Sequence, residues 1–131
     1  AWRRSPENGG LKLLQTASTL PGDFDGRRST AECLVHPNGR FVYVSNRGHD
    51  SIAAYRISSD DGRVSLIEIQ KTGGEEPRNF FINSTGQWLL AENQNSNTIV
   101  VFRVAADGSL AQTETTVPVG RPVCIRALPT K

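Results

Sequence analysis

Three charged side chains, Glu32, Arg47 and Arg78, have the types needed for acid–base chemistry on an anionic small molecule. A glutamate can orient a water molecule or take a proton from it. An arginine can stabilise an oxygen on which negative charge develops, or hold a phosphate or carboxylate through two parallel hydrogen bonds. We therefore take these three residues as the candidate catalytic groups.

Further polar side chains in the same stretches can contact such a molecule. His49 can act as an acid, a base or a hydrogen-bond donor, and Asn46, Gln94 and Arg121 complete the candidate substrate-binding set. Each candidate also has a structural interpretation. Glu32 can simply pair with a neighbouring arginine, the arginines can cap loops or bridge repeat units, and the histidine can fix its own loop. The sequence leaves both interpretations open.

Motifs for other chemistries are absent from the sequence. It has no Ser-His-Asp order, Cys-His pair, metal-spaced histidine cluster or phosphate-binding glycine loop. We therefore expect neither a metal nor a cofactor. The formal charge of +2 is too small to predict nucleic-acid binding. No apolar run reaches the roughly 18 residues of a membrane-spanning helix, so no membrane association is expected.

The cysteines and the first residues bear on the cellular compartment. The opening AWRRSPENGG lacks the apolar core of a signal peptide. Cys33 and Cys124 are too few for a disulfide framework. We predict that both are buried thiols in strands, which suits a reducing compartment. The expected location is therefore the cytoplasm.

An internal repeat organises the chain. HPNGRFVYVSNRGHDSIAAYRI aligns without a gap with NSTGQWLLAENQNSNTIVVFRV at an offset of 47 residues. The alignment pairs Gly39 with Gly86, and Asn46 with Asn93. Repetition at this length is typical of stacked or radial units, which bury their apolar surface only against neighbouring units.

Short β-rich runs alternate with turn residues, and no window shows a sustained helical period. Asn-Gly and Asp-Gly steps suit tight hairpin turns. Apolar runs such as FVYV and IVVF predict strands that are covered on both faces. Four antiparallel strands with both faces covered describe a β-propeller blade. The expected strands are 31–36, 40–45, 51–57 and 63–70, then 79–83, 87–92, 98–104 and 110–116.

The predicted fold class is therefore all-β, with two and a half to three propeller blades along residues 1–131. Residues 1–20 should form the outer strands of an incomplete blade, 31–70 and 79–117 two blades, and 122–128 a closing inner strand. A propeller closes with about 4 to 8 blades, so ring closure should need further blades or self-association. Apolar side chains should fill the space between blades: Phe41, Tyr43, Ile52, Tyr55, Trp88, Leu90, Ile99 and Phe102.

Strand order gathers the candidate residues at one end of the blades. In an up-and-down blade, the first strand starts at the end where the second strand stops, and the first strand lines the central channel. Residues 31–32 and 77–78 should therefore share one mouth of the channel with the connections 46–50 and 93–97. Binding residues commonly lie on such loops. His36 precedes a turn at the opposite mouth and should be structural.

The segments STAECLVHPNGRFVYVSNRGHDSIAAYRI, TGGEEPRNFFINSTGQWLLAENQNSNTIVVFRV and PVCI resemble the C-terminal third of the lactonase family of seven-bladed β-propellers. NRGHDSI and PRNF are more specific than a generic blade repeat. The family includes propeller-type 6-phosphogluconolactonases and fungal carboxy-muconate cyclases. Two features depart from it. A histidine-containing segment of the family's N-terminal half is not in this chain, and Cys33 stands where an aliphatic residue is expected.

The resemblance implies a hydrolase of the pentose phosphate pathway that opens a sugar lactone, 6-phosphogluconolactone, without a metal. A lactone is an activated ester, so Glu32 suits water activation and the arginines suit an anionic substrate. Two alternatives stay open. One is a lactonising cyclase of the carboxy-muconate type, and the other is a propeller fragment that binds a partner without catalysis. The chain alone should be inactive, because part of a ring cannot surround a substrate.

Overall fold

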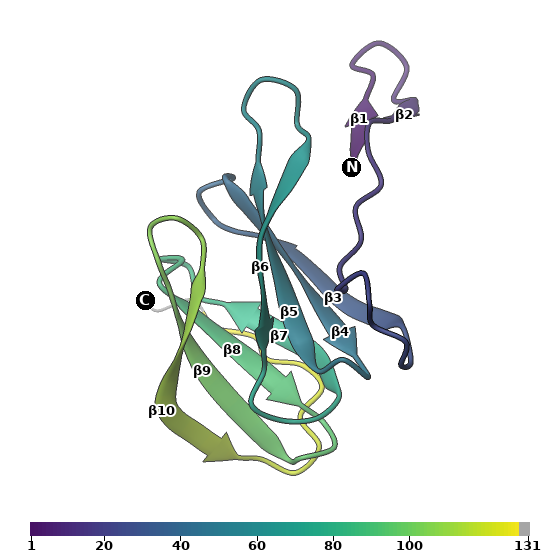
Figure 1. The fold of residues 1–131 in the computed structure, drawn as a ribbon. Coiled ribbons are helices and arrows are strands. Elements are labelled where there is room, and N and C mark those ends of the chain that lie inside the picture. Colours follow the sequence, from purple (N-terminus) through teal and green to yellow (C-terminus); the bar gives the residue numbers. More distant parts are fainter. Residues whose placement is uncertain (129–131) are drawn as a thin grey trace.

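The computed structural model describes residues 1–128, which form strands β1 to β10 and no helix (Figure 1). Two four-stranded antiparallel sheets follow chain order, which confirms the all-β prediction of propeller blades. The first blade contains β3 (Ser29–Val35), β4 (Phe41–Arg47), β5 (Ser51–Ile57) and β6 (Val64–Lys71). The second blade contains β7 (Pro77–Ile82), β8 (Trp88–Asn93), β9 (Thr98–Val104) and β10 (Leu110–Pro118).

The two blades pack face to face around an apolar core. Polar contacts across the same interface reinforce it. The Tyr43 hydroxyl donates to the Gly108 carbonyl at 2.9 Å, and His36 Nε2 contacts the Gly86 carbonyl oxygen at 2.8 Å. His36 is thus a buried link between blades, as expected. The largest core side chains are Phe41, Tyr43, Ile52, Phe80, Leu89 and Phe102.

The outer face of the second blade is more open than predicted. Leu89 and Ala91 on β8 are buried against the first blade, so the alternating Trp88 and Leu90 point to the opposite face. No sheet within residues 1–128 covers that face. Trp88 is therefore 39% exposed, and the prediction that it fills a space between blades is wrong.

Both cysteines are exposed, so the prediction of buried thiols is wrong. Cys33 lies on the side of β3 that faces away from the second blade, where it lines a hollow of about 410 Å³ with Trp2 and Val42. Cys124 lies in residues 122–128, which form no strand although an inner strand is predicted there. An inner strand pairs with the second strand of its own blade, and no such strand follows within the described residues.

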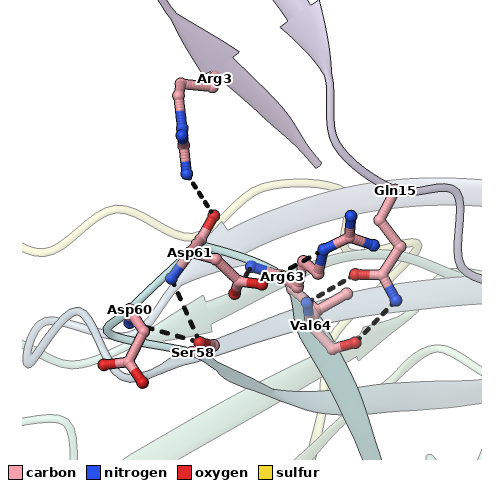
Figure 2. A network of polar contacts seen from close by, with 7 residues as sticks. All are labelled: Arg3, Gln15, Ser58, Asp60, Asp61, Arg63 and Val64. Carbon is pink, nitrogen blue, oxygen red and sulfur yellow. Dashed lines mark hydrogen bonds and ion pairs between the residues drawn. The ribbon is translucent and has the colours of Figure 1, made fainter.

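An N-terminal arm is attached to the outside of the first blade. Its hairpin consists of β1 (Trp2–Arg4) and β2 (Leu11–Leu13). Gln15 then pairs with the backbone of Val64 through Nε2 to the carbonyl at 2.9 Å and through Oε1 to the amide at 2.7 Å (Figure 2). Arg3 also donates to the Asp61 carbonyl at 3.0 Å. The Gln15 side-chain amide therefore makes the two hydrogen bonds with the Val64 backbone that a residue of a neighbouring strand would otherwise make.

Because residues 1–128 form strands and no helix, this part of the chain contains no helix that could span a membrane.

Candidate functional site

The starts of the inner strands lie beside the ends of the second strands at one mouth of the blades. Ser29 pairs with Arg47 in the first blade, and Pro77 pairs with Asn93 in the second. This register is the one that the strand-order argument requires. The loops that follow β4 and β8 therefore open at the same end as the candidate residues.

Two of the three candidate catalytic residues line one hollow. Arg47 and Arg78 face it together with Thr30 and Ala31, and its volume is about 250 Å³. Arg47 comes from the end of β4 and Arg78 from the start of β7, so the hollow spans both blades. Two guanidinium groups from neighbouring blades can hold one anion or two anionic groups of one molecule.

The Arg47 side chain is anchored to the start of β3. Its Nη2 donates to the Ser29 hydroxyl at 2.8 Å and to the Thr30 carbonyl at 3.2 Å. Its Nε is buried and has no hydrogen-bond partner in the described part of the chain. The structural interpretation of Arg47 proposed that it caps its own loop. The side chain instead anchors the start of β3, and it also lines the hollow.

Glu32 follows Ala31 on β3, and two donors hold its carboxylate. The backbone amide of Cys33 donates to Oε1 at 2.9 Å, and the side-chain amide of Asn79 donates to Oε2. The partner is therefore an amide on the next blade. The ion pairs of residues 1–128 join other groups, so the interpretation in which Glu32 pairs with an arginine is not what the structure shows.

His49 is held within its own loop. Its Nδ1 lies 2.8 Å from the Ser51 hydroxyl, and its ring meets Phe24 edge-on at 4.8 Å between centroids. Burial lowers the pKa of His49, and the Lys71 ammonium lowers it further, against the opposing charge of Asp50. The lowered pKa favours the neutral form of the ring. His49 does not line the hollow between the arginines.

Asn46 is fully buried and its amide is used for packing. Its Oδ1 accepts from the Thr19 hydroxyl at 2.6 Å, and its Nδ2 donates to the Thr19 carbonyl at 2.8 Å and to Ser51 Oγ at 3.2 Å. In the second blade Asn93 Nδ2 likewise donates to the Thr72 carbonyl at 3.2 Å. These asparagines attach each blade to the chain before it.

Gln94 and Arg121 lie at the same mouth but outside the hollow. The backbone amide of Gln94 donates to the Glu76 carbonyl at 3.0 Å. The backbone amide of Arg121 donates to Asn97 Oδ1 at 3.0 Å. Both contacts hold the loop around 93–97, so in these blades the two residues are peripheral to the arginine hollow.

Asp50 and Asn79, which were not among the residues predicted from the sequence, organise the mouth. Asp50 Oδ1 accepts from the amides of Gly48 at 3.2 Å and Glu76 at 2.9 Å, which joins the loops of both blades. Asn79 contacts Glu32 from the next blade. A comparison of the two repeats could have pointed to Asn79, because it stands 47 positions after Glu32. No group of three or more His, Cys, Asp or Glu residues within 1–128 lies close enough together to hold a metal ion.

Two antiparallel blades with inner-strand starts and polar loops at one mouth define part of a β-propeller, with a basic hollow at that mouth. The chain belongs to the lactonase family of such propellers, because the family model "Lactonase, 7-bladed beta-propeller" matches residues 1–127. It is 36% identical over 125 residues to the 6-phosphogluconolactonase of Bacillus subtilis, covering 95% of this chain and 36% of that protein. It is 45% identical over 98 residues to the 6-phosphogluconolactonase of Formosa agariphila, covering 73% of this chain and 28% of that protein.

Solved structures agree with the assignment. A protein from Lactobacillus plantarum matches with a TM-score of 0.92 and 28% identity, over 98% of this chain and 38% of that one. The periplasmic gluconolactonase of Pseudomonas aeruginosa matches with a TM-score of 0.88 and 32% identity, over 95% of this chain and 36% of that one. The chain therefore spans about a third of the length of the proteins it resembles.

Proposed function

We propose that these blades belong to a propeller that hydrolyses a sugar lactone, and that the substrate is 6-phosphogluconolactone. The family assignment and the names of two relatives, both 6-phosphogluconolactonases, support the reaction class. The observation that carries the proposal is the hollow between Arg47 and Arg78. Glu32 does not line this hollow, but it directly follows the lining residue Ala31 on β3. Each group suits one requirement of opening a phosphorylated lactone.

The reaction adds water to the lactone carbonyl. Glu32 takes a proton from the attacking water as its oxygen bonds to the carbonyl carbon. The ring C–O bond then breaks, and the proton passes to the departing ring oxygen, which becomes the new hydroxyl. The amides of Cys33 and Asn79 each donate a hydrogen bond to the Glu32 carboxylate. These two bonds fix the position and orientation of the carboxylate.

The two arginines divide the negative charge of the substrate. The Arg47 guanidinium is anchored through Nη2 to Ser29 and Thr30, so it is a fixed donor at the wall of the hollow. A fixed donor suits the oxyanion, because it needs no reorganisation when charge develops. Arg78 is exposed at the rim and suits the phosphate, which an arginine fork binds through two hydrogen bonds.

The test uses a complete propeller in which this chain supplies the C-terminal blades, joined for instance to the N-terminal blades of the Bacillus subtilis relative. Glu32→Gln should lower kcat for 6-phosphogluconolactone by about 10²–10⁴-fold, because the base is lost, with little change in unfolding. Arg78→Lys should mainly raise KM, because the fork is lost. Arg63→Lys, on the far turn of the first blade, is the matched control and should change neither.

Two results would remove the proposal. Wild-type turnover by Glu32→Gln would exclude Glu32 as the base and leave the arginines as anion binders. Lactone formation from a carboxylated diene acid, without hydrolysis of the sugar lactone, would favour the cyclase reaction instead. The isolated 131-residue chain is expected to be inactive, and full activity in a confirmed monomer would contradict the requirement for a surrounding ring.

A further inference from the structure

Glu92 is a buried carboxylate for which the proposed reaction has no use. It lies near the end of β8, is 0% exposed, and neither carboxylate oxygen has a hydrogen-bond partner of normal geometry within residues 1–128. The equivalent position in the first blade holds Ser45, whose hydroxyl accepts the Glu32 amide at 3.0 Å. An ionised carboxylate buried without donors is strongly unfavourable, whereas a neutral carboxyl is tolerated.

Asn79 stands directly opposite Glu92 in the pairing of β7 with β8. Side chains of such a cross-strand pair lie on the same face of the sheet, with Cβ atoms about 4.5–5.5 Å apart. Asn79 is 7% exposed, and its Oδ1 is also buried without a partner in the described residues. Three buried acceptor oxygens therefore lie close together, and none of them has a hydrogen bond of normal geometry within residues 1–128. The backbone amide of Ile125 lies near Glu92 as a donor, outside that geometry.

The orientation of the Asn79 amide is fixed by its other contact. Its Nδ2 donates to Glu32 Oε2 on the first blade. An ionised carboxylate can only accept hydrogen bonds, so the nitrogen must face Glu32 and the oxygen must face away from it. A flip of the amide would place two acceptors together and cannot resolve the missing donor.

We infer that Glu92 carries a proton and donates it in a hydrogen bond to Asn79 Oδ1, so that Asn79 connects Glu92 to Glu32 across the two blades. One proton satisfies Asn79 Oδ1 and removes the charge from the buried carboxyl group. The resulting chain runs from the Glu92 hydroxyl to Asn79 Oδ1, and from Asn79 Nδ2 to Glu32 Oε2. Asn79 and Glu92 are then positioning residues for Glu32.

The charges that surround Glu92 are consistent with this state. Burial raises the pKa of Glu92, and the negative charge of Glu32 raises it further. A hydrogen-bonding contact from the Ile125 backbone amide and the charge of the Arg126 guanidinium lower the pKa of Glu92, but each effect is smaller than that of burial, so the pKa remains raised. Arg126 is exposed, so water screens its charge.

The first experiment is an NMR titration of the 131-residue chain with ¹³C-labelled glutamate side chains. The Glu92 carboxyl resonance should titrate above the ordinary glutamate value of about 4.3. The Asn79 side-chain amide resonances should move with the same midpoint, and Glu92→Gln should abolish that movement. Asn93 is the internal control, since its amide faces Thr72 on the other side of β8. Titration of Glu92 at or below the ordinary value, or an Asn79 amide that ignores it, overturns the inference.

The second experiment measures unfolding in urea against pH. A carboxyl whose pKa is raised by folding contributes stability that is complete below its unfolded value and is lost as pH rises through the folded value. Glu92→Gln keeps a donor at every pH, so its urea midpoint should equal that of wild type near pH 4 and exceed it increasingly toward pH 8. Glu114→Gln, at an exposed position on β10, should follow wild type throughout.

A bound cation is the competing explanation for the clustered oxygens. If Ca²⁺ at millimolar concentration raises the urea midpoint of wild type at pH 7 but not that of Glu92→Gln, the oxygens hold a cation and the proton assignment is wrong. No change with Ca²⁺ supports the proton. The titration and unfolding experiments test the link from Glu92 through Asn79 to Glu32 in the isolated chain. Their outcome therefore does not depend on the proposed function.

The role of the link in catalysis rests on the proposed function and is measured separately. In the complete propeller, Asn79→Ala should lower kcat for the lactone about tenfold or more with little change in KM, because Glu32 loses its orientation and the arginines do not. The pH dependence of kcat should also change in Glu92→Gln. An inactive propeller would defeat the proposed function and leave the titration result standing, whereas unchanged kcat in Asn79→Ala would remove the positioning role.

Discussion

Phe41 and Trp88 occupy the same position in the two repeats but differ in burial, with 1% and 39% of their surfaces exposed. Phe41→Ala should cost about 3–5 kcal/mol, because a fully buried aromatic leaves a cavity when it is truncated. The site cannot collapse easily, since Phe41 lies so close to Gly108 that a Cβ there would fall 2.5 Å from the ring. Trp88→Ala should cost only about 1–2 kcal/mol, because part of the ring is already hydrated and water fills the space it leaves.

The comparison is made by urea unfolding of the isolated chain, followed by far-ultraviolet circular dichroism because one variant removes a tryptophan. The slopes should be similar, so that midpoints report free energy. Sedimentation should first establish that each protein is a monomer. Equal costs for the two truncations in a monomer would refute the reasoning, since they would mean that the open face of the second blade is covered in solution.

Two further changes probe the contacts between blades. Tyr43→Phe removes only the hydroxyl that donates to the Gly108 carbonyl, so it should cost about 1–2 kcal/mol in urea unfolding, and a cost below about 0.5 kcal/mol would show that water replaces the bond. Gly86→Ala should cost about 2–4 kcal/mol in the same assay, because a Cβ would lie 2.3 Å from the His36 ring at a φ of +75°. Gly39→Ala, with a similar φ of +72° and no atom within 4 Å, should cost about 1 kcal/mol, and equal losses for both glycines would mean that strain alone acts.

The repeat made the strands predictable, because turn residues and apolar runs are local properties of the chain. Whether another sheet packs on a given face of a blade does not depend on local sequence. The pattern around Trp88 and Cys33 looks like that of a strand between two sheets, and whether a sheet lies there depends on other parts of a propeller. The prediction succeeded on the faces that the two blades bury against each other and failed on the outer faces.

Only part of the candidate site could be predicted from the repeat and its strand order. Strand order predicted that Glu32, Arg47 and Arg78 share one mouth, and in the structure Arg47 and Arg78 line one hollow there whereas Glu32 does not. It could not separate Asn46, whose amide is consumed by packing, from residues that face the hollow. Hydrogen-bond partners come from segments distant in sequence, and neither composition nor spacing reveals them. The link from Asn79 to Glu32 was missed for that reason.

One position at which the two repeats agree fixes each blade to the chain before it, and two positions at which they differ contain candidate catalytic residues. Asn46 matches Asn93, and both are buried and bonded to a preceding threonine. Arg47 instead matches Gln94, and Glu32 matches Asn79. We therefore expect the blades to tolerate an exchange at the differing positions better than a loss of the shared asparagine.

A pair of neighbouring substitutions tests this division. Arg47→Gln installs the residue that the second blade already carries, and it removes a buried Nε that lacks a partner in residues 1–128, so it should change the free energy of unfolding by less than about 1 kcal/mol. Asn46→Ala leaves the Thr19 hydroxyl and carbonyl without partners and should cost about 2–4 kcal/mol in urea unfolding. If Arg47→Gln destabilised the chain as much as Asn46→Ala, Arg47 would be a structural cap of β3, and its assignment to the substrate would have to be withdrawn.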